Sequence, residues 1–204
     1  MLTLFLLICR KCVAFFIASL FIGFAMSAVY IDVNWMHNAL HENSVTEVLQ
    51  EIILVIIMGL FFWSSGKRPE QRGGLILIGG FYLCMLIREL DDIFDMISHG
   101  SWLWFALATT AICVFLSLRA STSTITGLTD FLQHRTWLMT ATGLIIVLVF
   151  SRLIGMHQLW QHLMLDGYNR VVKNMAEEAS ELMGYCVCLL STVLFLKETR
   201  EKTN

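Results

Sequence analysis

Apolar residues run along this chain in long stretches that short polar segments separate. A helix needs about 20 apolar residues to cross the hydrocarbon layer of a bilayer. Six stretches approach this length, at residues 13–31, 45–63, 74–87, 102–118, 137–156 and 182–196. The third and sixth reach it only if their helices continue through polar ends. The pattern therefore predicts six transmembrane helices.

The composition fits such a protein. Hydrophobic residues make up 57% of the 204 residues and charged residues 15%, whereas a soluble domain has about a quarter charged residues. So little polar sequence cannot cover a water-soluble globule, which excludes a soluble enzyme, a disordered chain and a nucleic-acid binder. The single proline, Pro69, lies between the second and third spans. We expect an all-α, polytopic integral membrane protein in which residues 1–204 form a single transmembrane domain.

The distribution of Lys and Arg predicts the orientation of the chain, because cytoplasmic loops carry an excess of positive charge. With six spans, one side receives Arg10, Lys11, Lys67, Arg68, Arg72, Arg119, Arg135, Lys197, Arg200 and Lys202. That side is predicted to be cytoplasmic and to hold both termini, with Trp63 and Trp137 at its interface. Compact loops and an N-terminus unlike a transit sequence favour a bacterial inner membrane.

Charged residues inside the spans fall at similar depths. Counted from the cytoplasmic end of each span at about 1.5 Å per residue, Glu51 lies about 18 Å up. By the same count Glu89, Arg152 and Glu181 each lie about 22 Å up. An ionised group facing lipid is costly, so such groups face a bundle interior and pair. We therefore expect one shared site in the outer leaflet, with spans 2, 3, 5 and 6 as the core and spans 1 and 4 peripheral.

Neighbouring residues extend this site. Asp92 and Glu178 fall roughly one turn farther out, at about 27 Å, and Arg88 adjoins Glu89. The predicted ligand-binding residues are Glu51, Arg88, Glu89, Asp92, Arg152, Glu178 and Glu181. Helical spacing also predicts two polar stripes, namely Arg88, Asp92, Asp95 and His99 on the third span and Asn174, Glu178, Glu181, Tyr185 and Cys188 on the sixth. The acids expected to face the aqueous boundary instead are Asp91, Asp95, Asp166 and Glu177.

The predicted site has more carboxylates than cations, since only Arg88 and Arg152 oppose its five acids. Some carboxyl groups then hold protons, or a cation binds, or water hydrates them. A divalent cation with oxygen ligands, such as Ca²⁺, Mg²⁺ or Mn²⁺, suits Glu51, Glu89 and Glu181 as metal ligands. The missing Glu-x-x-His pairs argue against a di-iron site. The two arginines are also able to hold a lipid phosphate.

Two classes of function stay open. In the first, an outward-facing cavity binds a cation, a proton or a polar lipid headgroup, for ion-linked transport or metal-assisted chemistry. In the second, the chain is a non-catalytic membrane subunit or sensor whose intramembrane charges are structural or bind a partner. The first predicts a water-reachable cavity at the carboxylates and the second predicts tight ion pairs. Whether the chain is an enzyme is left undecided, and its partners are the lipid bilayer and either a second copy or another membrane subunit.

Three local expectations complete the prediction. Ser44 and Glu47 have the spacing of a capping box that opens the second span, and residues 121–126, rich in Ser and Thr, are expected to form a loop. Two glycine pairs are expected to permit close packing of helices. They are Gly73 with Gly74 and Gly79 with Gly80.

Overall fold

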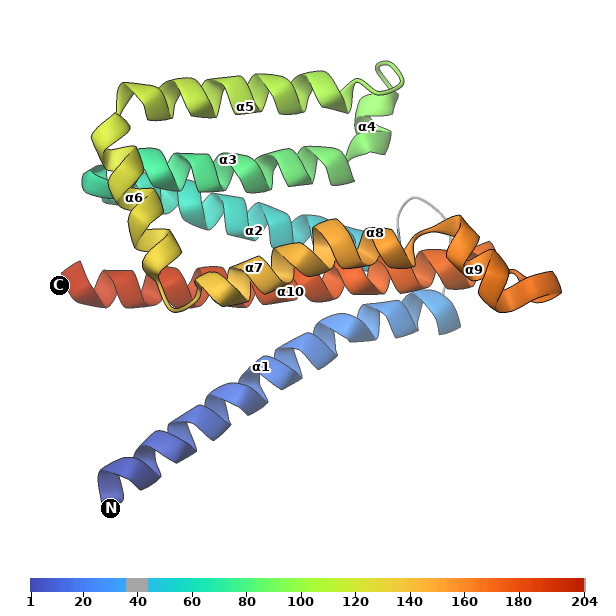
Figure 1. Cartoon of the computed structure of the whole chain (residues 1–204), viewed down its shortest axis with the longest axis horizontal. Coiled ribbons are helices and arrows are strands. Elements are labelled where there is room, and N and C mark those ends of the chain that lie inside the picture. The colour runs from blue at the N-terminus through green and yellow to red at the C-terminus, as the bar shows by residue number, and fades with distance from the viewer. Residues whose placement is uncertain (36–43, 204) are drawn as a thin grey trace.

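The structure, a computed structural model, describes residues 1–35 and 44–203 (Figure 1). It contains helices, turns and no strand within these ranges, which confirms the all-α prediction. The long helices are α1 (Leu2–Asn34), α2 (Val45–Lys67), α3 (Arg72–Glu89), α5 (Trp102–Arg119), α6 (Ser121–Gln133) and α10 (Arg170–Thr203). A further long helical segment consists of α7 (Trp137–Ile145), the π-helix η2 (Ile146–Phe150) and α8 (Ser151–Ile154). The short elements are η1 (Pro69–Gln71), α4 (Asp91–Asp95), α9 (His157–Met164) and η3 (Leu165–Gly167).

Each of the six predicted spans corresponds to a helical segment, although the fifth, predicted to run to residue 156, ends at Ile154. Among the described residues, five segments are long and apolar enough to cross a membrane, namely α1, α2, α5, α7–η2–α8 and α10. Helix α3 is not one of them, because its 18 residues include Arg72, Arg88 and Glu89. Several long apolar helices therefore give the chain the character of a membrane-embedded protein.

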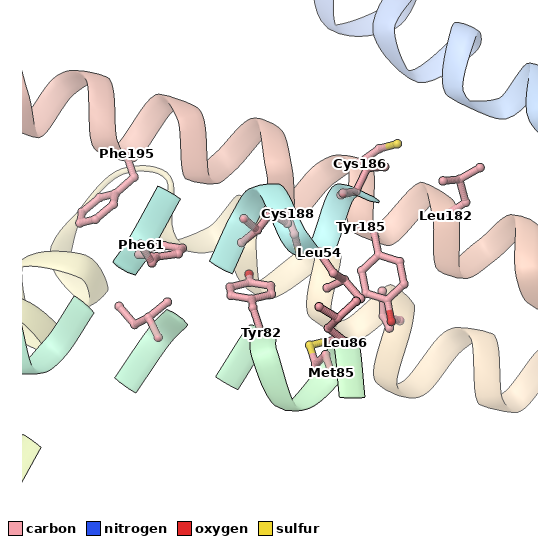
Figure 2. Packing of buried hydrophobic residues seen from close by; sticks show 14 of the residues in the cluster. Leu54, Phe61, Tyr82, Met85, Leu86, Leu182, Tyr185, Cys186, Cys188 and Phe195 are labelled. Carbon is pink, nitrogen blue, oxygen red and sulfur yellow. The ribbon is translucent and has the colours of Figure 1, made fainter. Parts of the chain in front are cut away.

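The helices pack in the spatial order α5, α3, α2, α10 and α7–η2–α8, and α1 contacts both α2 and α10 (Figure 1). Helix α10 is the most enclosed span: 56% of its most apolar window is buried, against 11% for α1 and for α5. Figure 2 shows the centre of the apolar core, where Phe61 of α2 stacks on Tyr82 of α3 with ring centroids 6.0 Å apart. Phe195 of α10 packs on the Phe61 ring.

Figure 1 shows two distinct ends of the bundle, which we name the α6 end and the α9 end. Helix α6 crosses the bundle at the first, and both chain ends lie there too, as α1 diverges from the other helices toward its N-terminus. The short helices α4 and α9 lie at the opposite end. Segments predicted to share one side of a membrane therefore share one end of the structure.

The structure corrects three local predictions. Helix α1 begins at Leu2 and runs through Arg10 and Lys11, because no Gly or Pro interrupts it there. Residues 121–126 form the first turns of α6 instead of a loop. Tertiary contacts stabilise this helix, since Ser123 Oγ accepts from Gly73 N at 3.1 Å and Thr124 Oγ1 donates to the Ser117 carbonyl at 2.8 Å.

The third correction concerns the predicted stripe from Arg88 to His99. Helix α3 ends at Glu89, and α4 ends at Asp95, so the four residues do not lie on one helix. The Asp95 carboxylate accepts from Gly100 N at 2.7 Å, a hydrogen bond that lowers the pKa of Asp95. Gly100 adopts a φ of +76°, in the left-handed region that favours glycine. This turn redirects the chain into α5.

Glycines permit two close helix contacts, as predicted for the third span. A Cβ added at Gly74 would lie 2.7 Å from the backbone N of Leu128, so α3 and α6 touch through their backbones. At Gly184 of α10 an added Cβ would lie 2.9 Å from the Gly143 carbonyl oxygen of α7. The second contact brings the α7–η2–α8 segment against α10, and both segments carry charged residues farther along.

Asp32 of α1 caps the N-terminus of α2. Its fully buried carboxylate accepts from Val45 N at 2.8 Å, from Thr46 N at 2.9 Å and from the Thr46 hydroxyl at 2.5 Å. Ser44 Oγ accepts from Glu47 N at 3.1 Å, which confirms the predicted Ser44 cap. Free backbone N–H groups and the positive end of the helix dipole both favour a carboxylate here. Asp32 thereby fixes the end of α1 to α2.

We predict that Asp32→Ala destabilises the protein by about 1–3 kcal/mol, the range expected when buried donors lose their acceptor. Equilibrium unfolding in detergent micelles, followed by circular dichroism, measures the change. Asp166→Ala, at an exposed acid of η3, is the matched control and should leave the unfolding curve in place. Equal stability of Asp32→Ala and the unsubstituted protein would contradict the capping role.

Candidate functional site

Glu181 of α10 is the centre of a group of charged residues at the α9 end. Its side chain is 2% exposed, and its Oε1 accepts from Arg152 Nη2 and, at 3.1 Å, from Ser151 Oγ. Arg88 Nη2 of α3 lies 4.0 Å from the same oxygen. Three helices, α3, α8 and α10, therefore place charges around one buried carboxylate.

Glu89 joins this group from the last turn of α3. Arg88 Nη2 lies 3.6 Å from Glu89 Oε1, so one guanidinium faces both Glu89 and Glu181. Tyr185 Oη of α10 donates to the same Glu89 oxygen at 2.7 Å. Tyr185 is fully buried in the apolar core (Figure 2). These contacts hold the end of α3 against α10.

Glu177 and Lys173 extend the group along α10. Arg152 Nη1 donates to Glu177 Oε1 at 2.9 Å, and Lys173 Nζ donates to Glu177 Oε2 at 2.9 Å and to the Gly155 carbonyl at 3.1 Å. The sequence prediction of a water-facing Glu177 is wrong, because its side chain is only 16% exposed. The spacing of four residues between Lys173, Glu177 and Glu181, which shares one helix face, is the signal that identifies them.

Glu178 has a different environment from the other acids. Gln50 of α2 donates its Nε2 to the Glu178 carbonyl at 3.0 Å and to Glu178 Oε2 at 3.1 Å. Gln50 is fully buried, and its Oε1 has no hydrogen-bond partner. Within the described part of the chain no Lys, Arg or His pairs with Glu178. We name the whole set the charge cluster, comprising Arg88, Glu89, Arg152, Lys173, Glu177, Glu178 and Glu181.

Two predicted site residues lie at the margin of the charge cluster. Glu51 is partly buried on α2, where it experiences the negative charges of Glu47 and Glu89. It borders a groove of about 260 Å³ whose other lining residues are apolar. Asp92 lies on α4 with an exposed side chain, because α3 ends before it. The structure thus joins Arg88, Glu89, Arg152 and Glu181 by direct contacts, with Glu178 on the next turn of α10.

The described residues contain no group of three or more His, Cys, Asp or Glu side chains arranged to hold a metal ion. Glu51, Glu89 and Glu181, the predicted metal ligands, do not form such a group. Glu89 and Glu181 instead use their oxygens to accept from Tyr185 and Arg152. The divalent cation stays a prediction from the sequence alone.

The charge cluster has fewer cations than carboxylates. Arg88, Arg152 and Lys173 oppose Glu89, Glu177, Glu178 and Glu181, and Glu51 adds a further negative charge nearby. Such a site favours the binding of a positive charge, since unbalanced carboxylates in an apolar surrounding are costly.

No family model, curated protein or solved structure matches this chain.

We predict that Arg152→Met destabilises the protein by about 3 kcal/mol, because the buried carboxylate of Glu181 loses its closest cation, the half-exposed Arg152. The double variant Arg152→Met, Glu181→Met should recover most of this loss, since no buried charge is stranded. Glu177 keeps Lys173 as a partner in both variants. Unfolding free energies of the two single variants and the double variant form the cycle, and additive losses would contradict the coupling.

Proposed function

We propose that the chain is a six-span integral membrane protein whose termini and α6 end lie in the cytoplasm. The length and apolarity of five helical segments support this topology, as does the shared location of both chain ends (Figure 1). Helix α3, held between α2 and α5, completes the set of six as the third span in chain order. Its Arg88 and Glu89 then lie in the outer half of the membrane, where α10 supplies partners for both. A bacterial inner membrane is the proposed location.

The charge cluster, in this proposal, binds a proton or a small cation and serves ion-linked transport. The single observation that carries the proposal is the pair formed by Glu178 and Gln50. A buried amide donates to the Glu178 carboxylate and keeps its own acceptor, Oε1, without a donor. A protonated Glu178 would supply the missing O–H donor, because a carboxylic acid and an amide form a pair with two hydrogen bonds. A cation between the two side chains would satisfy the same oxygens.

The tight ion pairs favour the second class of function. Arg152, Glu177, Lys173 and Glu181 form an unbroken line of contacts, as expected if these charges fix the positions of helices in a non-catalytic subunit. Glu178 separates the two classes, because it forms no such pair among the described residues. We therefore assign a structural role to the arginine pairs and ligand binding to Glu178.

We predict that infrared difference spectra between acidic and alkaline samples contain the C=O band of a buried carboxylic acid, and that Glu178→Gln abolishes it. Addition of a cation that competes for the site should remove the same band at fixed pH. Glu177→Gln, which changes a carboxylate paired with Arg152 and Lys173, is the control and should retain the band. A band that survives in Glu178→Gln would contradict the proposed site.

The proposed orientation is tested by labelling introduced cysteines in intact cells with a membrane-impermeant maleimide. In a background without Cys9 and Cys12, Asp166→Cys at the α9 end should react from outside. Glu70→Cys at the α6 end should react only after the membrane is permeabilised. The reverse pattern, or equal labelling of both, would contradict an orientation with the α6 end in the cytoplasm.

A further inference from the structure

A second candidate site lies at the α6 end, remote from the charge cluster (Figure 1). A pocket of about 560 Å³ opens between η1, the C-terminal half of α6 and the last turns of α10. Glu70 and Gln71 of η1 and Asp130 of α6 line one part of it, and Arg135 and Glu198 line another. The buried ring of Phe195 also borders it.

Gln71 presents an unpaired acceptor in this pocket. The residue is 7% exposed, and its Nε2 donates to Asp130 Oδ2 at 2.5 Å. Since a carboxylate only accepts hydrogen bonds, the amide nitrogen must face Asp130, which fixes the orientation of the Gln71 amide. Its Oε1 is buried and has no hydrogen-bond partner. A donor from outside the described chain would satisfy this oxygen.

The cations that border the pocket are already engaged. Arg135 donates from Nε and Nη2 to the two carboxylate oxygens of Glu198, and His134 Nε2 lies 3.4 Å from Glu198 Oε2. Glu70 is exposed and forms no ion pair with any described residue. The groups left to meet a ligand include three acceptors, Gln71 Oε1 and the carboxylates of Glu70 and Asp130, beside the exposed amide of Gln133.

We propose that this pocket binds an alkylammonium group. Its N–H bonds would donate to Gln71 Oε1, and its positive charge would oppose Asp130 and Glu70, so that each open acceptor receives a donor or a charge. A metal ion fits less well, because no three acidic, Cys or His side chains of the described residues are arranged around one point. The alkylammonium group has two sources, a free amine from the cytoplasm or the headgroup of phosphatidylethanolamine.

The test compares ligands that have N–H donors with ligands that carry the same charge without them. The full-length protein in phosphatidylcholine nanodiscs is titrated with 1,4-diaminobutane and with tetramethylammonium by isothermal calorimetry. Native mass spectrometry measures retention of phosphatidylethanolamine against phosphatidylcholine. Gln71→Met removes the unpaired acceptor, Glu70→Gln removes an exposed charge without a packing change, and Asp166→Asn is the control at the opposite end.

The proposal predicts binding of the diamine or selective retention of phosphatidylethanolamine, and little binding of tetramethylammonium. Diamine binding identifies a free amine as the source, and lipid retention alone identifies the headgroup. Gln71→Met should weaken the binding about tenfold, the loss expected for a hydrogen bond to a charged group. Glu70→Gln should weaken it by less, about twofold to fivefold, as expected for an exposed charge. Equal binding of tetramethylammonium, no binding of either ligand, or unchanged affinity in both variants would overturn it. Because Glu178→Gln should leave this binding intact, the result is independent of the proposed proton site.

Discussion

The buried carboxylate of Glu181 is the constraint on which one end of this structure depends. A charge enclosed among apolar helices requires partners, because desolvation of an isolated carboxylate is very costly. Arg152 and Ser151 from α8 and Arg88 from α3 supply these partners. The backbone contact of Gly143 with Gly184 allows α7–η2–α8 to approach α10 closely enough for this. The close contact of Gly143 with Gly184 thereby helps to bring Arg152 and Glu181, farther along the same two segments, within reach of each other.

The sequence predicted the helical segments and the central charges for a physical reason. Depth along a span depends only on helical rise, so residues at one depth, such as Glu89, Arg152 and Glu181, are candidates for contact. The prediction failed where it assumed that a helix continues, because α3 ends before Asp92 and a turn at Gly100 follows. It failed for Glu177 because polar residues near a boundary face either water or neighbouring helices, and only packing decides between them.

Features that depend on pairing across helices were beyond the sequence. The unpaired oxygens of Gln50 and Gln71 arise from hydrogen bonds to residues distant in the chain, Glu178 and Asp130. The helical state of residues 121–126 depends on contacts with α3 and α5. The hydrogen bonds of hydroxyl groups in the apolar half of α10 also depend on a second helix. Ser191 Oγ, for example, lies 2.6 Å from Thr140 Oγ1 of α7. Such interhelical hydrogen bonds stabilise the packing of membrane helices.

Helix α10 connects the two candidate sites. It carries Glu178 and Glu181 at the α9 end and Glu198 at the α6 end, and it is the most enclosed of the five segments long and apolar enough to cross a membrane. The two ends present different chemistry. Acids at the first are largely neutralised by arginine and lysine, whereas the second presents a buried acceptor without a partner, Gln71 Oε1, beside exposed acids. A positively charged ligand is favoured at both ends, at the first by Glu178 and at the second by Gln71 and its acidic neighbours.

Acidic and guanidinium side chains of separate helices meet beside α10. The dipolar coupling between ¹⁵N of the Arg152 guanidinium and ¹³C of the Glu181 carboxyl, measured by solid-state NMR in lipid bilayers, tests it most directly. We expect the strong coupling of an ion pair with an N–O distance within about 4 Å, and its loss in Glu181→Gln. A coupling too weak to detect in the unsubstituted protein would show that Arg152 and Glu181 do not form this pair.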